Sequence, residues 1–127
     1  GTMIKDLVQL TLDTALYPKN IYVHEQKKSG TDADEYVVYS LSGDSKEDFA
    51  DDAVLTKNAS ITIRYYYRAE KLDNYSTRKK VREIEDLIET SLENTGFTIP
   101  FGRFDAGDVD DIGYMVTVFE CEYWRVT

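Results

Sequence analysis

The side chains that most often carry out enzyme chemistry are scarce in this sequence. His24 is the only histidine and Cys121 the only cysteine. A catalytic triad, a zinc site or a histidine general base would have to recruit His24, and no cluster of partner residues accompanies it. We therefore expect His24 to be structural. Cys121 lies in a strand-like pattern, which predicts an inert, buried thiol.

Two acidic stretches have the composition of calcium-binding loops but not their spacing. When Asp108 is taken as the first ligand, Phe119 falls where an EF-hand requires a bidentate glutamate. When Asp44 is taken as the first ligand, Phe49 falls where the loop requires glycine. The sequence also lacks a glycine-rich phosphate loop and a nucleophile elbow. These observations predict solvated turns, with no metal, no cofactor and no enzymatic activity.

Tyrosines are numerous, and three of the ten are consecutive at positions 65–67. Aromatic rows of this kind stack on bases in single-strand-binding proteins, which also need a basic groove. Here 24 acidic residues outnumber 15 basic ones, which gives a net charge of −9 that repels phosphate groups. We expect no specific nucleic-acid binding. Alternation predicts that Tyr65 and Tyr67 pack inward, while Tyr66 faces out as an interface anchor.

The longest helical segment has its charges in an unusual order, with bases first and acids after them. This order opposes the helix macrodipole at a cost of about 0.3–1 kcal/mol for each charge near an end. Pairs such as Lys79–Glu83 and Arg82–Asp86 offset part of that cost, which favours a solvated face. Alternatively, the basic end contacts an acidic surface on a neighbouring copy, as in head-to-tail rings. The candidate interface residues are Arg78, Lys79, Lys80, Arg82, Glu89 and Glu93 here, Tyr66, and Asp44, Asp48 and Asp51 in an acidic loop.

Hydrophobic spacing predicts two helices that position these charges. The first covers Ile4–Leu16 and ends before Pro18, which cannot continue a helix. The second covers Thr77–Glu93 and stops at Gly96. Candidate N-caps for the second helix are Asp73, Asn74 and Ser76. The apolar faces are Leu7, Val8, Thr11, Leu12 and Ala15 in the first helix, and Val81, Ile84, Leu87, Ile88 and Leu92 in the second.

Alternating and β-branched residues predict five strands. The clearest has a period of two, so one side should face the core and the other should face water. Pro100 and Gly102 interrupt the fourth strand ahead of an acidic turn at 105–111, which suggests an edge or a bulge. Polar loops at 25–34 and 42–53 are long enough to serve as contact sites. The strands are Ile21–His24, Glu35–Leu41, Ala59–Arg68, Phe97–Phe104 and Tyr114–Val126.

The element order α-β-β-β-α-β-β predicts an α+β fold, with a mostly antiparallel sheet and both helices on one face. A chain of 127 residues suits a single domain, which we place at residues 3–127 with Gly1 and Thr2 as a cloning remnant. Hydrophobic residues make up 42% of the chain and charged residues 31%. No apolar run approaches the roughly 20 residues that cross a bilayer, so we expect a soluble protein of a bacterial cytoplasm.

Four segments together resemble the small tail terminator (tail completion) proteins of long-tailed bacteriophages and prophages. They are the opening helix MIKDLVQLTLDTALYP, the strand ITIRYYYR, the helix KKVREIEDLIETSLENTGF and the closing strand YMVTVFECEYWRV. The resemblance rests on element order and on the character of the second half. It implies an α+β structural protein without catalytic residues, which forms a hexameric ring on the tail tube, caps tube growth and provides the surface for head–tail joining.

The resemblance implies three partners: other copies of the chain, the tail tube protein and the head connector or neck protein. It places the protein in the host cytoplasm during virion assembly and then in the virion tail. The loops at 25–34 and 42–53 are the candidates for partner contacts. Two alternatives stay open, namely a neck or head-completion protein and a small acidic inhibitor that mimics DNA. The interleaving of acidic and basic residues weakens the second alternative.

Overall fold

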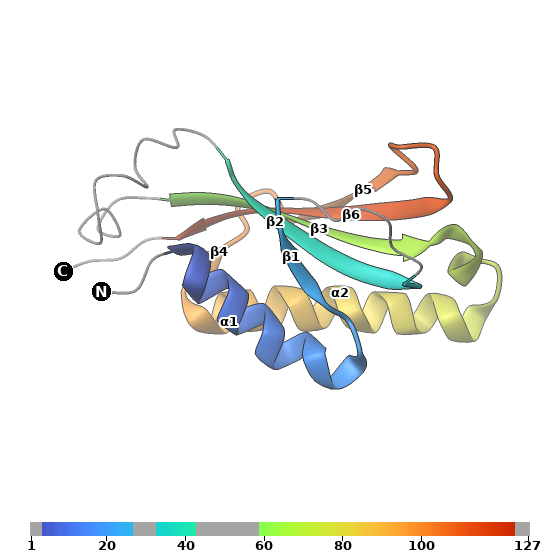
Figure 1. The fold of residues 1–127 in the computed structure, drawn as a ribbon, viewed down its shortest axis with the longest axis horizontal. Helices are drawn as coiled ribbons and strands as arrows, with labels where there is room; N and C mark the ends of the chain where they lie inside the picture. The colour runs from blue at the N-terminus through green and yellow to red at the C-terminus, as the bar shows by residue number, and fades with distance from the viewer. Residues whose placement is uncertain (1–3, 27–32, 43–58, 124–127) are drawn as a thin grey trace.

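The computed structural model of the chain describes residues 4–26, 33–42 and 59–123. Two long helices lie side by side beneath one face of a twisted sheet (Figure 1). Short 3₁₀ turns, η1 (Tyr17–Lys19) and η4 (Ala69–Leu72), follow the first helix and precede the second. In chain order the other elements are α1 (Ile4–Leu16), β1 (Val23–Glu25), β2 (Glu35–Ser42), β3 (Ala59–Arg68), α2 (Tyr75–Thr95), β4 (Phe97–Thr98), β5 (Arg103–Gly107) and β6 (Tyr114–Tyr123).

The sheet has six strands in the order β1-β2-β3-β6-β4, and β5 also pairs with β6. Strand β1 runs parallel to β2, whereas the other pairs are antiparallel. Strands β4 and β5 occupy successive stretches of the same side of β6, because Thr98 lies opposite Glu122 and Arg103 opposite Phe119. The predicted α+β fold, with a mostly antiparallel sheet and both helices on one face, is confirmed.

The predicted strand Phe97–Phe104 is wrong as a single element. The chain turns after β4, where the Gly102 N–H donates to the Ile99 carbonyl at 3.0 Å and Gly102 adopts a φ of 72°. A left-handed φ suits glycine, so Gly102 permits two short strands where alternation predicts one. The order thus becomes α-β-β-β-α-β-β-β. Because β5 continues to Gly107, the acidic turn also begins later than predicted.

Strands β1 and β2 also differ from their predicted bounds, and β2 ends one residue later than predicted, at Ser42. Strand β1 begins at Val23 and not at Ile21, because η1 and a left-handed Asn20 with φ of 61° lengthen the connection from α1. Strand β6 is described as far as Tyr123. The last predicted residues of that strand, 124–126, lie outside the described part of the chain.

Helix α2 is longer than predicted at both ends, and its caps explain where it stops. Among the three candidate N-caps, Asn74 is the cap, because its side chain accepts a hydrogen bond from the Thr77 N–H at 3.1 Å. At the other end, Gly96 adopts a φ of 113° and donates its N–H to the Glu93 carbonyl at 3.2 Å. The predicted glycine stop is confirmed.

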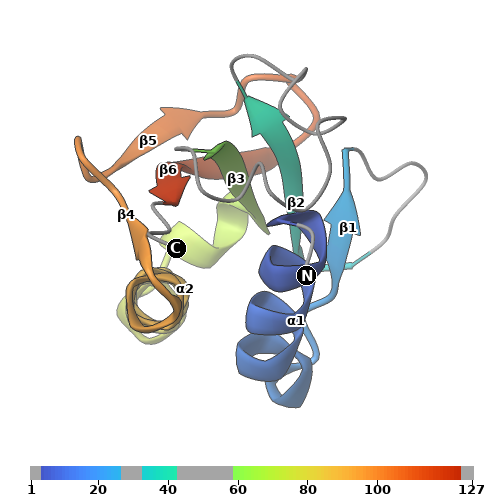
Figure 2. The same cartoon turned by 90° about the vertical axis from the view of Figure 1, so that its left-hand side faces the viewer.

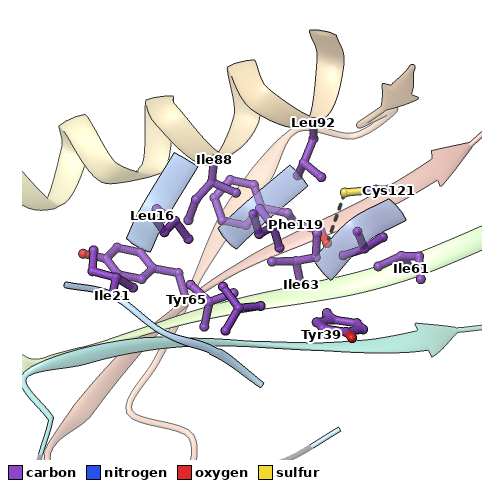
Figure 3. Close-up of a cluster of buried hydrophobic side chains, with 14 of the residues drawn as sticks. Leu16, Ile21, Tyr39, Ile61, Ile63, Tyr65, Ile88, Leu92, Phe119 and Cys121 are labelled. Atoms are coloured by element: carbon purple, nitrogen blue, oxygen red, sulfur yellow. Dashed lines mark hydrogen bonds between the residues drawn. The ribbon is translucent and has the colours of Figure 1, made fainter. Parts of the chain in front are cut away.

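The hydrophobic core lies between the helices and the sheet. Figure 3 shows Leu16, Ile88 and Leu92 from the helices meeting Ile63 and Phe119 from the sheet. The predicted apolar stripes of both helices pack here, with Leu7 and Ala15 partly buried beside the main row. The inward packing of Tyr65 and Tyr67 and the burial of Cys121 are confirmed. The buried helix residues of this core are Ile4, Val8, Leu12, Leu16, Val81, Ile84, Ile88 and Leu92.

The opposite face of the sheet is less exposed than the sequence predicts. Thr62, expected on the wet side of β3, is only 8% exposed, and Tyr66 is half-buried. The reason lies in the neighbouring strands, because Tyr66 pairs with Tyr36 of β2 and with Val116 of β6. Large side chains on adjacent strands cover one another, which the sequence of a single strand does not reveal.

Candidate assembly surface

The start of α2 is a basic, aromatic surface. Arg78, Lys79 and Lys80, all predicted interface residues, are exposed. Tyr75 is 69% exposed, and the Arg78 guanidinium lies 6.0 Å from the centre of its ring. Arg78 also donates from Nη1 to the Leu72 carbonyl at 2.9 Å, which ties it to the end of η4. Three of the predicted interface residues therefore share one exposed turn.

Arg82 is turned toward the sheet, and its predicted pairing with Asp86 is wrong. Its Nη1 donates to both carboxylate oxygens of Glu85, at 2.8 and 2.9 Å, and lies 3.8 Å from Asp105 Oδ1. Hydrogen bonding to Glu85 raises the pKa of Arg82. Arg82 pairs with Glu85 because the Glu85 carboxylate lies on the sheet side of the helix. Asp86 instead pairs with Arg103 of β5.

Glu85 is the unexpected residue of α2, because its side chain is only 1% exposed. Besides Arg82, its carboxylate accepts a hydrogen bond from the Thr117 hydroxyl and lies 3.8 Å from Arg103 Nε. A buried carboxylate is costly unless charged and hydrogen-bonded partners surround it. The sequence did carry a signal, since Glu85 lies four residues after Val81 and three before Ile88, within the buried stripe.

Arg103 attaches strand β5 to the outer side of α2. Its Nη1 lies 2.8 Å from Asp86 Oδ1 and 3.1 Å from Glu89 Oε1. The carboxylate of Glu89, a predicted interface residue, is therefore already engaged within the chain. Glu93, one turn further on, is exposed. Sequence reasoning missed Arg103 because its partners lie in another element, 14 and 17 residues earlier in the numbering.

Tyr66 lies on the outer sheet face as predicted, but it does not stand free. Its ring stacks on Tyr36 with centroids 4.7 Å apart, and Tyr114 meets Tyr36 edge-on at 5.5 Å. The Tyr114 hydroxyl donates to the Ala33 carbonyl. Burial, together with the neighbouring tyrosines, raises the pKa of Tyr36 to about 12. Tyr66 thus belongs to a tyrosine cluster within the sheet, which limits what it can offer to a partner.

Three predicted interface residues cannot be placed. Asp44, Asp48 and Asp51 lie outside the described residues, as do most of the loops at 25–34 and 42–53. Their proposed role in partner contacts stays a prediction.

Exposed apolar side chains concentrate in β5 and in the turns at its two ends, residues 101–112, which we call the edge hairpin. Eight large hydrophobic residues are exposed in the described part of the chain, and four of them fall within residues 101–112. The tip of the hairpin is ordered by Asp108, whose carboxylate accepts the N–H groups of Ile112 and Gly113 at 3.1 and 2.9 Å. Apolar groups along a sheet edge mark a site of association. The four residues are Phe101, Phe104, Val109 and Ile112.

Sequence reasoning missed this hairpin because its apolar residues are separated by charged ones and look unremarkable. Only the pairing of β5 on the outer side of β6 shows that they lie along a sheet edge.

The residues that could have supported catalysis do not come together in the described part of the chain. Within residues 4–26, 33–42 and 59–123, no group of three or more His, Cys, Asp or Glu side chains is placed to hold a metal ion. His24 lies edge-on to Tyr36, with ring centres 6.2 Å apart. Burial raises the pKa of the Cys121 thiol to about 12. Neither described helix is both long and apolar enough to cross a membrane.

Comparison with known proteins adds no relative. No family model matches this chain, and neither a curated protein nor a solved structure matches it. The likeness to tail terminators accordingly rests on the sequence features given above, and the functional argument rests on the surface of the fold.

Proposed function

We propose that this protein is a structural virion assembly protein of the tail terminator type. It forms a ring that caps the tail tube and provides the surface on which the head docks. It acts in the cytoplasm of a bacterial host during assembly and then in the virion tail. Its work is done by surfaces that fit copies of itself, the tube protein and the head connector, without catalysis.

The observation that carries the proposal is the apolar edge hairpin at residues 101–112. Phe101, Phe104, Val109 and Ile112 leave large apolar areas in water in a single copy of the chain. Burying such side chains against a partner yields about 1.5–3 kcal/mol each. A chain that leaves them exposed along a sheet edge is suited to association.

The charge order of α2 supports the same proposal. The exposed bases at its start oppose the helix macrodipole, and a neighbouring acidic surface would offset that cost. The acidic remainder of the chain gives an overall charge of −9, which suits a ring through which DNA passes without being held.

The pairing of acids on α2 weakens the alternative of a DNA mimic. Such an inhibitor needs rows of free carboxylates that stand in for phosphates. Glu85, Asp86 and Glu89 are instead engaged by Arg82 and Arg103. The neck or head-completion protein stays the nearest alternative, because it too would act through association.

The test is electron microscopy of the concentrated protein, alone and mixed with purified phage tails. We expect rings of uniform diameter, or caps on one end of the tails. Caps on isolated heads in place of tails would identify a neck protein. A chain that binds neither particle and shows no rings at any concentration would contradict the proposal.

A matched pair of variants tests the charge argument. Lys79→Glu reverses one exposed charge at the start of α2, and Lys79→Arg keeps it. We expect the first to weaken assembly and the second to leave it unchanged. Added salt should weaken assembly of the parent protein, because screening shortens the reach of exposed charges. Assembly that is indifferent to both changes would exclude a role for this basic turn.

A further inference from the structure

A pocket of about 510 Å³ opens between the first half of α2 and the junction of α1 with β1. Ile21 and Ile84 are buried and Leu87 is half-buried, so together they give the pocket an apolar lining. Charged groups from three elements complete the wall. They are Lys19 from η1, Glu35 from β2, and Lys80 and Glu83 from α2. An apolar lining bordered by ammonium groups suits an aromatic side chain, which contacts these cations as it enters the pocket.

The charges around the pocket are not equally available. The Glu35 carboxylate accepts the Tyr65 hydroxyl hydrogen bond and lies 3.7 Å from Lys71 Nζ. In the described part of the chain, no ion pair engages Lys19 or Lys80. No ion pair among the described residues engages Glu83 either, so a partner would meet two ammonium groups and one carboxylate, with cations in excess.

Phe101 is the most exposed large hydrophobic side chain in the described residues, at 92%. It occupies the turn between β4 and β5, which is closed by the hydrogen bond from the Gly102 N–H to the Ile99 carbonyl. Both strands beside the turn pair with β6, so the turn is held at its two ends. A projecting ring on a fixed turn loses little conformational freedom when it binds.

The turn that carries Phe101 and strand β1 beside the pocket belong to opposite edges of the sheet, because β4 and β5 lie at one end of the strand order and β1 at the other. Figure 2 shows this arrangement, with β4 and β5 on the side of α2 and β1 on the side of α1. Because its strands are fixed to β6, Phe101 does not reach the pocket of its own chain. A second copy of the chain presents the same ring without that restriction.

We propose that Phe101 of one copy inserts into this pocket of a second copy, between Lys19 and Lys80. An ammonium group near the face of an aromatic ring is attracted to it, and the apolar lining accepts the rest of the ring. The proposal deepens the proposed function and rests on it, since it names the contact by which copies assemble.

Charge complementarity selects a second copy as the occupant. The turn lies beside the β6 segment with Glu120 and Glu122, because Thr98 pairs with Glu122 and Arg103 with Phe119. Arg103 is already engaged by Asp86 and Glu89. The surroundings of Phe101 are therefore acidic, and they meet a pocket whose unengaged cations are Lys19 and Lys80. Opposite charges around a buried anchor set its partner and orientation.

The contact joins two different surfaces, so it is heterologous. Contacts of this kind repeat in the same sense from copy to copy, and they close into a ring when the rotation between copies permits. One chain therefore carries both halves of the contact.

Complementary variants test this arrangement. Phe101→Ser removes the inserted ring, and Leu87→Arg blocks the pocket from a half-buried position at the edge of the core. Each variant alone should associate about 10- to 100-fold more weakly than the parent protein, as expected for losing one buried aromatic side chain. A mixture of the two should form dimers and nothing larger in sedimentation velocity, because one intact junction remains. Leu10→Ser, an exposed apolar residue on α1, is the matched control and should assemble like the parent.

A peptide probe tests the pocket even where the parent protein is monomeric. We would titrate a cyclic peptide with the sequence of residues 98–103 into ¹⁵N-labelled protein. Amide shifts at Ile21, Lys80 and Leu87, absent with a serine analogue of the peptide, are the expected result. A millimolar peptide that moves none of these resonances would overturn the proposal.

The two proposals fail in different ways. If tails acquire caps while Phe101→Ser assembles like the parent and the peptide does not bind, the pocket contact is wrong and the proposed function stands. If the mixed variants form dimers but no ring or cap appears under any condition, the contact stands and the terminator function is wrong.

Discussion

Helix α1 and strand β5 are attached to the same sheet by different forces. Helix α1 contributes Ile4, Val8, Leu12 and Leu16 to the core, whereas no residue from 100 to 113 is buried. Strand β5 is held by its backbone pairing with β6 and by the contacts of Arg103 with α2. The comparison indicates that burial of apolar side chains fixes the α1 side of the molecule, which we call the apolar flank. Charged side chains hold the β5 side, the polar flank, which carries the exposed hairpin.

The largest expected effect comes from the apolar flank. Leu12→Ala removes a fully buried side chain from the row of α1 and leaves a cavity between helix and sheet. We expect a loss of about 2–5 kcal/mol in the free energy of unfolding, measured by urea denaturation. The exposed Leu10→Ala on the same helix is the control and should cost less than about 0.5 kcal/mol. Similar losses for both variants would mean that α1 is not seated as described.

The polar flank should respond almost as strongly when its charge balance is broken. Arg82→Met leaves the buried Glu85 carboxylate without its two shortest ionic contacts, and we expect a loss of about 3 kcal/mol. Adding Glu85→Leu should recover most of that stability, because an apolar pair replaces a buried ion pair at little cost. A double-mutant cycle measures this coupling. If the second change deepens the loss, Glu85 does more than satisfy Arg82.

Alkaline pH should act on the α1 flank through Tyr39, whose hydroxyl donates to Gln9 Oε1 at 2.7 Å. Burial, followed by the carboxylates of Glu25, Asp6 and Asp13, raises the pKa of Tyr39 to about 12. Because this value exceeds the ordinary 10, the folded state favours the neutral phenol. The resulting stability is present below pH 10 and is lost as the pH rises through about 12.

Urea denaturation between about pH 9 and about pH 11.5 checks this sign. Tyr39→Phe should reduce the decline of stability with pH, although the other groups with raised pKa values also contribute to it, namely Tyr36, Tyr65, Tyr66, Tyr67 and Cys121. Gln9→Ala keeps the phenol and should lower stability at the start of the range while the decline persists. A decline of the same steepness in Tyr39→Phe would show that other groups account for it.

The smallest effect should come from the surface contacts of β5. Arg103→Gln removes ion pairs with the partly exposed Asp86 and Glu89 and the longer 3.8 Å contact with buried Glu85, which keeps Arg82, and it should cost about 1 kcal/mol. We expect faster hydrogen exchange at the amides of Arg103–Gly107 and no change in α1. Lys5→Gln, which removes the 2.9 Å pair with Glu25 on the other flank, should leave β5 unchanged. Protection of β5 that survives Arg103→Gln would assign its attachment to backbone pairing alone.

The sequence by itself determined the parts of this protein that depend on regular spacing. Alternation in Ala59–Arg68 and the apolar stripe of α2 identified those elements, because burial on one face imposes a period of two or about 3.6. Gly96 marked the end of α2, and Asn74 was one of three candidate caps at its start, because unpaired backbone groups at helix ends require particular residues. The α+β class followed from the order of these elements.

The tertiary structure alone decided which charges are buried and which apolar groups are exposed. From the sequence, Glu85 looks like one more acidic residue of a solvated helix. In the fold, Thr117 of β6 and Arg103 of β5 lie against its carboxylate. Phe101 reads as a strand residue until the chain turns beside it and leaves it outside the core. Both outcomes depend on contacts between segments far apart in the chain. The spacing of residues within one segment does not predict such contacts.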